Sequence, residues 1–171
     1  NIGDFLVDPN KGSNTKTAFN VESSEPKSTE ENKEASEIEI ESILTLLASA
    51  SLEKGEKTYK KCGSCHSYTK DGKNKVGPNL YQVLNAKLGV KDGFNYSSAL
   101  KAFEGADSWD YSALNGFLKK PKEYMPGTKM GFAGLKKVSD RAAVIAYLRT
   151  LSDSPAELPT TEEIEKEASG G

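Results

Sequence analysis

The amino-acid sequence predicts an all-α fold in which short helices are joined by long loops. Several stretches carry apolar residues three and four positions apart, which is the pattern of a helix with one buried face. No stretch alternates apolar and polar residues convincingly, as a half-buried strand would. Hydrophobic residues make up only 36% of the 171-residue chain, so we expect a small apolar core. No stretch approaches the roughly 20 apolar residues of a transmembrane helix.

The predicted helices lie between residues 51 and 151. Their apolar residues define the buried faces, and two of them begin after a side chain that can cap a helix N-terminus. The four helices are expected over Ser51–Lys61, Ser97–Phe103, Tyr111–Leu118 with Asp110 as N-cap, and Asp140–Leu151 with Ser139 as N-cap. Loops rich in glycine, proline and asparagine are expected over Thr69–Gly77, Lys87–Asn95 and Lys119–Gly134. Such long loops in a small domain favour a large buried cofactor that organises them.

Charge divides the chain into three parts. Residues 1–51 carry 4 lysines and 10 acidic residues, residues 52–151 carry 18 basic and 9 acidic residues, and residues 152–171 carry 1 lysine and 6 acidic residues. The overall net charge of -2 argues against a nucleic-acid partner. We expect a disordered acidic linker over residues 1–37 and a short amphipathic lead-in over residues 38–51 that docks on the body. Residues 152–171 are expected to form an acidic flexible tail.

Both cysteines and the single histidine fall within five residues, Cys62-Gly-Ser-Cys65-His66. This is the C-x-x-C-H pattern of c-type haem attachment. Residues three apart at the end of a helix share a face. Both sulfurs can therefore reach the two vinyl groups of one porphyrin, with the histidine under the iron.

Three other interpretations of the motif are weaker. A structural zinc site takes four nitrogen or sulfur ligands, and the chain has no further cysteine or histidine. A thioredoxin-like redox pair belongs in a βαβ setting, which this sequence does not predict. A structural disulfide between Cys62 and Cys65 would leave His66 without a role.

An iron held by His66 takes a sixth ligand or keeps an open site. The only two methionines, Met125 and Met130, lie together in one downstream loop. A methionine is most often core filler, and this is what we expect of Met125.

Residues 53–151 resemble class I cytochrome c of the mitochondrial and α-proteobacterial type. Beside the attachment motif, the resemblance is carried by Lys75-Val-Gly-Pro-Asn-Leu80, Gly93-Phe-Asn-Tyr96, Pro121–Met130 with Phe132–Lys137, and Ile145–Leu148. It implies the class I fold, in which helices and ordered loops wrap around one haem c that is covalently attached through Cys62 and Cys65.

The resemblance also implies roles for single residues. His66 and Met130 would be the two iron ligands, and the Pro78 carbonyl would accept a hydrogen bond from the imidazole N–H of His66. Tyr96 and Trp109 would hydrogen-bond a buried haem propionate. Thr128 and Asn79 would satisfy polar groups nearby, while Leu80, Leu118, Phe132 and Leu148 would line the haem. The sequence departs from many family members in having Phe117 where they have a tyrosine.

The implied function is one-electron transfer rather than catalysis. The electrons would pass from a quinol–cytochrome c oxidoreductase to a terminal cytochrome c oxidase, and lysines near the haem edge would dock the carrier on acidic partners. Two alternatives stay open: an electron donor to a photosynthetic reaction centre, and a haem peroxidase or gas-binding haem protein if the methionine ligand is absent.

The two flanks resemble those of membrane-anchored α-proteobacterial cytochromes c. We therefore expect the chain on the periplasmic side of a bacterial inner membrane, with an anchor upstream of Asn1. The acidic residues of Glu30–Glu41 or Glu162–Glu167 are expected to fold over the lysines and weaken the encounter with a partner.

Overall fold

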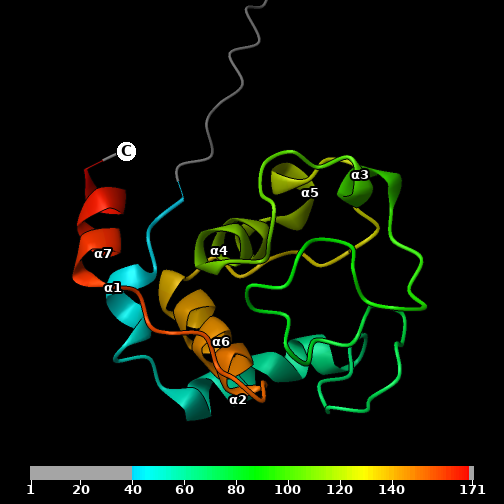
Figure 1. Cartoon of the computed structure of the whole chain (residues 1–171), viewed down its shortest axis with the longest axis horizontal. Helices are drawn as coiled ribbons and strands as arrows, with labels where there is room; N and C mark the ends of the chain where they lie inside the picture. Colours follow the sequence, from blue (N-terminus) through cyan, green and yellow to red (C-terminus); the bar gives the residue numbers. More distant parts are fainter. Residues whose placement is uncertain (1–39, 170–171) are drawn as a thin grey trace, which may run out of the picture. The chain divides into compact units, whose positions relative to one another are not determined.

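The computed structural model describes residues 40–169, which form helices and ordered loops (Figure 1). One isolated antiparallel bridge, between Lys87 and Ser108, is the only β pairing in that range, so the all-α prediction is confirmed. The helices are α1 (Leu44–Leu47), α2 (Leu52–Gly63), α3 (Ser98–Lys101), α4 (Tyr111–Lys119), α5 (Pro121–Tyr124), α6 (Val138–Thr150) and α7 (Thr161–Ala168). None of the helices in this range is both long and apolar enough to cross a membrane. The linker expected over residues 1–37 lies outside the described residues.

The crossing of α2 and α6 is the most extensive helix contact. It depends on Gly55, because a Cβ atom at this position would lie 2.2 Å from the carbonyl oxygen of Ala143. One turn further along α2, the ring of Tyr59 packs against that of Tyr147, with centroids 5.7 Å apart. The glycine therefore lets the two helix backbones approach closely, and the crossing fixes the end of α2 that carries the cysteines.

The apolar core lies between α1, α2, α4 and α6. α4 contributes a nearly continuous buried stretch from Ala113 to Leu118, and α6 contributes another from Arg141 to Ala146. Met125 is 1% exposed and packs in this core, as expected. α4 thus packs against both α6 and α5, the helix that precedes the loop containing Met130.

Side-chain N-caps were predicted for α4 and α6, and only that of α4 is present. Asp110 caps α4 as predicted, since its carboxylate accepts a hydrogen bond from the Ala113 N–H at 2.7 Å. The N-cap predicted at Ser139 is wrong: α6 begins at Val138, whose side chain packs against the core. The Ser139 hydroxyl instead accepts a hydrogen bond from Lys54 on α2 at 2.9 Å.

Both flanks of the body contain ordered structure within the described residues. The lead-in packs its apolar residues Ile43, Leu44 and Leu47 into the core. Residues 152–171, expected to form a flexible tail, include α7, which begins with a capping box between Thr160 and Glu163. Figure 1 shows α1 and α7 on the side of α6 that faces away from the long loops.

Candidate haem-attachment site

The attachment motif lies where α2 ends. Cys62 belongs to the last turn, and Cys65 and His66 follow in a tight turn in which their backbone N–H groups both donate to the Cys62 carbonyl. Burial raises the pKa of the Cys62 thiol to about 11, with a further contribution from Cys65. The Tyr59 hydroxyl donates to the His66 carbonyl at 3.3 Å. The end of α2 thus holds two thiols and one imidazole together on a fixed backbone.

The His66 imidazole has a fixed orientation. Its Nδ1 lies 2.7 Å from the carbonyl oxygen of Pro78, which is the hydrogen bond expected from the sequence. Burial lowers the pKa of His66, while the hydrogen bond to Pro78 acts in the opposite direction. A neutral imidazole that donates through Nδ1 leaves Nε2 with its lone pair available for a metal.

Gly77 is the residue at this site whose role the sequence did not reveal. A Cβ atom at this position would lie 2.2 Å from Cε1 of His66 and 2.6 Å from Nδ1. The loop can lie flat against the imidazole only because Gly77 has no side chain. A single sequence does not distinguish such a glycine from one in an ordinary turn.

Asn79 organises the loop that carries Pro78. Its side-chain amide donates to the carbonyls of Thr69 (2.9 Å) and Gly72 (2.6 Å), and its Oδ1 accepts from the Tyr81 N–H at 2.6 Å. Its backbone N–H donates to Asn74 Oδ1 at 2.9 Å. The asparagine expected to satisfy polar groups near the haem therefore has its own groups occupied by the loop backbone, and it positions Pro78.

Met130 comes from the long loop after α5. Its side chain is partly buried and packs against the core. Its backbone N–H donates to the Thr128 hydroxyl at 3.3 Å, and the Thr128 N–H donates to the Met125 carbonyl at 3.1 Å. Thr128, expected to satisfy polar groups near the haem, thus satisfies the backbone of the methionine itself.

Tyr96 and Trp109, expected at a propionate, are both buried at 9% exposure. The Tyr96 hydroxyl accepts a hydrogen bond from the Lys91 N–H at 3.3 Å. Trp109 is held through its backbone N–H, which donates to the Ala86 carbonyl at 2.8 Å, and its ring packs 5.0 Å from that of Phe117.

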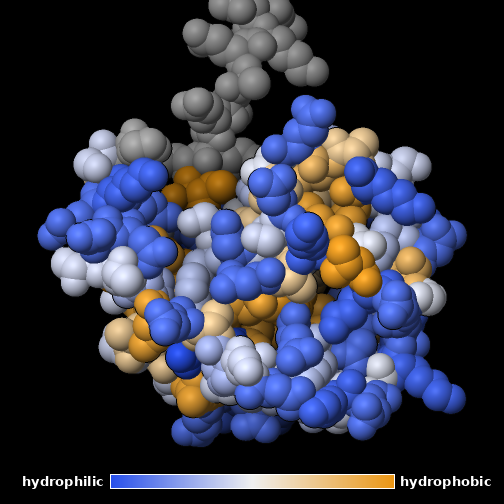
Figure 2. All heavy atoms as spheres, in the orientation of Figure 1, coloured by the Kyte–Doolittle hydropathy of each residue, from blue (hydrophilic) through white to orange (hydrophobic). Residues whose placement is uncertain are grey.

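These residues fit a covalently bound haem. Cys62 and Cys65 are both free cysteines. Leu80 and Phe132 pack against the core cluster and yet are only partly buried, so they present apolar surface that a large flat group would cover. Leu118 and Leu148, also expected to line the haem, are buried in the same cluster. Figure 2 shows hydrophobic side chains in the middle of the face in view, between hydrophilic ones.

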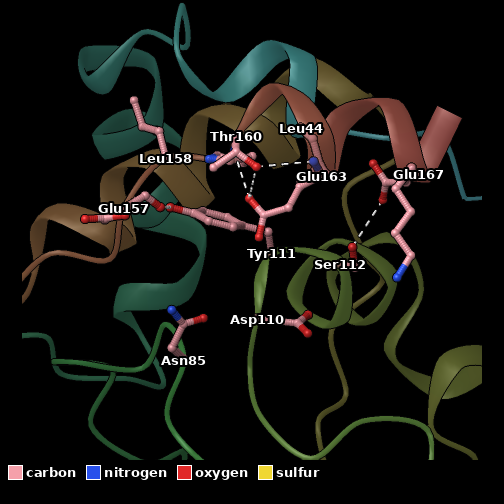
Figure 3. A pocket seen from close by; sticks show the side chains of 12 residues that line it. Leu44, Asn85, Asp110, Tyr111, Ser112, Glu157, Leu158, Thr160, Glu163 and Glu167 are labelled. Carbon is pink, nitrogen blue, oxygen red and sulfur yellow. Dashed lines mark hydrogen bonds between the residues drawn. The ribbon is translucent and has the colours of Figure 1, made fainter.

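A separate cleft of about 580 Å³ lies between α7 and α4 (Figure 3). Its lining includes Leu44, Tyr111 and, from α7, Glu163 and Glu167, and it contains none of the residues expected to hold a haem. Ser112 donates to Glu167 across it at 3.1 Å. The cleft marks the contact of the C-terminal flank with the body rather than the cofactor site.

Comparison with known proteins gives consistent matches over the body. A family model described as Cytochrome c matches residues 52–152. A cytochrome c homolog from Bradyrhizobium diazoefficiens is 51% identical over 121 residues, which cover 70% of this chain and 65% of the relative. A cytochrome c2 from Rhodomicrobium vannielii is 45% identical over 97 residues, covering 57% of this chain and 76% of the relative.

Among solved structures, cytochrome cH from Methylobacterium extorquens superposes with a TM-score of 0.54 at 39% sequence identity. The superposition covers 59% of this chain and 99% of that chain. The chain spans slightly less than two thirds of the length of the Bradyrhizobium relative.

Proposed function

The chain belongs to the cytochrome c family, with its class I all-α fold and a haem c attached through Cys62 and Cys65, and we propose that it carries single electrons on a haem ligated by His66 and Met130. The observation that carries this proposal is the His66 imidazole, whose Nδ1 lies 2.7 Å from the Pro78 carbonyl oxygen and whose pKa is lowered by burial. Bound haem supplies the reversible Fe(II)/Fe(III) couple, and a histidine–methionine ligand pair raises its potential.

The protein's own groups fix the geometry on which such a carrier depends. The Pro78 carbonyl orients the imidazole, and Asn79 and Gly77 hold that carbonyl in place. With His66 and Met130 as its ligands, the haem iron would offer no open position to a substrate. The chain would therefore act by outer-sphere electron transfer and not as a peroxidase or gas-binding protein.

Substitution of the two methionines tests the ligand assignment, because leucine keeps the volume and removes the sulfur. Met130→Leu should abolish the long-wavelength ferric absorption that a methionine–iron bond produces and should lower the reduction potential. Met125→Leu is the matched control and should keep both. If Met130→Leu kept this absorption, Met130 would not be the ligand.

We further propose that the carrier works between a quinol–cytochrome c oxidoreductase and a terminal cytochrome c oxidase. The supporting feature is a group of exposed lysines next to the attachment motif and the methionine loop, namely Lys60, Lys61, Lys75, Lys122, Lys129, Lys136 and Lys137. Exposed charges of one sign steer association with a partner of the opposite sign, and the rate falls as salt is added.

Stopped-flow oxidation by an oxidase tests this docking surface. Lys129→Gln, within the methionine loop, should lower the rate constant at low ionic strength and flatten its salt dependence. Lys166→Gln, on α7, is the matched control and should change neither. A rate without salt dependence in the unmodified protein would contradict the proposal.

Finally, we propose that the domain is held on the periplasmic side of a bacterial inner membrane by a segment upstream of residue 1. This proposal rests on the acidic flank and on the resemblance to anchored cytochromes c. Fractionation of the native protein tests it: recovery in a salt-washed membrane fraction is expected, and release with the soluble periplasm would contradict it.

A further inference from the structure

Arg141 of α6 is a charged side chain in the centre of the core. It is 0% exposed, and its guanidinium makes four hydrogen bonds. Nε donates to Asn115 Oδ1 at 2.7 Å, and Nη1 donates to the carbonyls of Leu135 (2.9 Å) and Lys136 (2.8 Å). Nη2 donates to Glu41 Oε2 at 2.9 Å. Burial of such a cation is stable only while its counter-ion and its hydrogen-bond acceptors compensate the charge.

Glu41, the counter-ion, comes from the lead-in and lies outside the part of the chain that the family model matches. Its carboxylate also pairs with Lys119 at the end of α4, at 2.9 Å, and its backbone carbonyl accepts from the Asn115 side chain at 2.8 Å. The hydrogen bond from Lys119, then a backbone hydrogen bond, and then the hydrogen bond from Arg141 lower the pKa of Glu41 to about 2. Glu41 thus stays charged and joins the lead-in to both α4 and α6.

The carbonyls that Arg141 binds form the end of the methionine loop. Leu135, five residues after Met130, also donates its N–H to the Leu118 carbonyl at 2.7 Å. Gly134 adopts a positive φ of 92°, and a Cβ atom there would lie 2.0 Å from the Lys119 carbonyl oxygen. Hydrogen bonds to the end of α4 and to the Arg141 guanidinium therefore fix the end of the methionine loop.

We infer that Glu41 is a positioning residue for Met130, acting through Arg141 and the carbonyls of Leu135 and Lys136. Without the carboxylate, the buried guanidinium has to move or admit water, and either change loosens its hold on these two carbonyls. The methionine loop then opens more readily. This inference rests on the proposed function, because it takes Met130 as the iron ligand.

Imidazole binding to the full ferric holoprotein measures how easily Met130 leaves the iron. Glu41→Ala should bind imidazole tighter by about tenfold, which corresponds to about 1.4 kcal/mol of loop opening. Glu41→Gln keeps an acceptor without the charge and should fall between Glu41→Ala and the unmodified protein. Glu53→Ala, which removes an exposed ion pair with Lys57 on α2, is the matched control and should bind as the unmodified protein does.

Two results overturn the inference in distinguishable ways. If Glu41→Ala and Glu41→Gln unfold more easily but bind imidazole as weakly as the unmodified protein does, Glu41 is structural and does not position Met130. If the unmodified protein binds imidazole as tightly as Met130→Leu does, Met130 does not protect the iron, and the proposed ligand set fails together with this inference.

Discussion

Replacement of Gly77 by alanine tests whether the loop next to His66 positions the imidazole. The new Cβ atom would lie 2.2 Å from Cε1 of His66, whereas ordinary contacts begin at 3.4 Å. The loop and the ring would therefore have to separate by about 1.2 Å. A movement of that size is enough to break the hydrogen bond of 2.7 Å between His66 and Pro78.

The expected loss of stability of Gly77→Ala combines two effects. Overpacking of a well-packed site costs about 1–3 kcal/mol, and loss of the hydrogen bond adds about 1 kcal/mol. The free energy of unfolding should thus fall by about 2–4 kcal/mol. The reduction potential should rise, because an imidazole without its carbonyl acceptor is a less basic ligand and stabilises Fe(III) less.

Guanidinium unfolding followed by the fluorescence of Trp109, the single tryptophan, measures the free energy of unfolding. Spectroelectrochemistry of the holoprotein measures the reduction potential. Gly63→Ala is the matched control within the attachment motif, because its Cβ atom would meet only the Tyr59 ring, at 3.7 Å. If Gly77→Ala behaved as Gly63→Ala does in both assays, the argument that the loop positions His66 would be refuted.

Three further substitutions test other parts of the molecule. Gly55→Ala should lower the free energy of unfolding by about 1–3 kcal/mol, because its Cβ atom would meet the Ala143 carbonyl at 2.2 Å; no change in the thermal midpoint would contradict the crossing described. Asn79→Ala should cost about 1–3 kcal/mol in the same assay, since it leaves buried loop groups without partners. Hydrogen bonds from the backbone and hydroxyl of Thr160 lower the pKa of Glu163 below its usual 4.5. The charged carboxylate therefore stabilises α7 fully above pH 4.5. This stabilisation is lost as the pH falls through the lowered pKa of Glu163. Amide exchange in α7 should therefore speed up on acidification, and Glu163→Gln should show a weaker pH dependence.

The attachment motif and the main helices could be predicted because each depends on residues close together in the sequence. Asp110 caps α4 through the N–H three residues later, and Cys62, Cys65 and His66 share one turn. Ser139 has the same local pattern as Asp110, but it does not cap α6. The helix begins one residue earlier, at Val138, which packs against the core, and the Ser139 hydroxyl accepts a hydrogen bond from Lys54 of α2 instead.

Apart from the hydrogen bond between His66 and Pro78, which the family resemblance implied, the contacts that position the site could not be predicted, because their partners do not share a local sequence pattern. Glu41 and Arg141 are 100 residues apart, and no pattern in either segment links them. Gly77 matters because of the ring of a residue eleven positions earlier, a proximity that only the folded loop creates. The charge of the C-terminal flank was evident from composition, whereas its helical structure depends on the capping box and on the packing of Ile164 against the core.

The placement of the acidic flanks bears on how the lysines would meet a partner. Among the described residues, Glu41 does contact one of the lysines that flank the methionine loop, Lys119, at 2.9 Å. Two acidic residues of α7, Glu163 and Glu167, instead line the cleft that α7 forms with α4, where Glu167 contacts Ser42 and Ser112. Asp153 pairs at 2.8 Å with Lys70, which is not one of those lysines. Figure 1 shows α7 across α6 from the long loops, and the lysines named above for docking are exposed. In the proposed encounter, negative charge on α7 away from the docking lysines would help to turn those lysines toward an acidic partner. The placement of α7 therefore supports orientation of the carrier, rather than masking of its proposed docking surface, as the role of this flank.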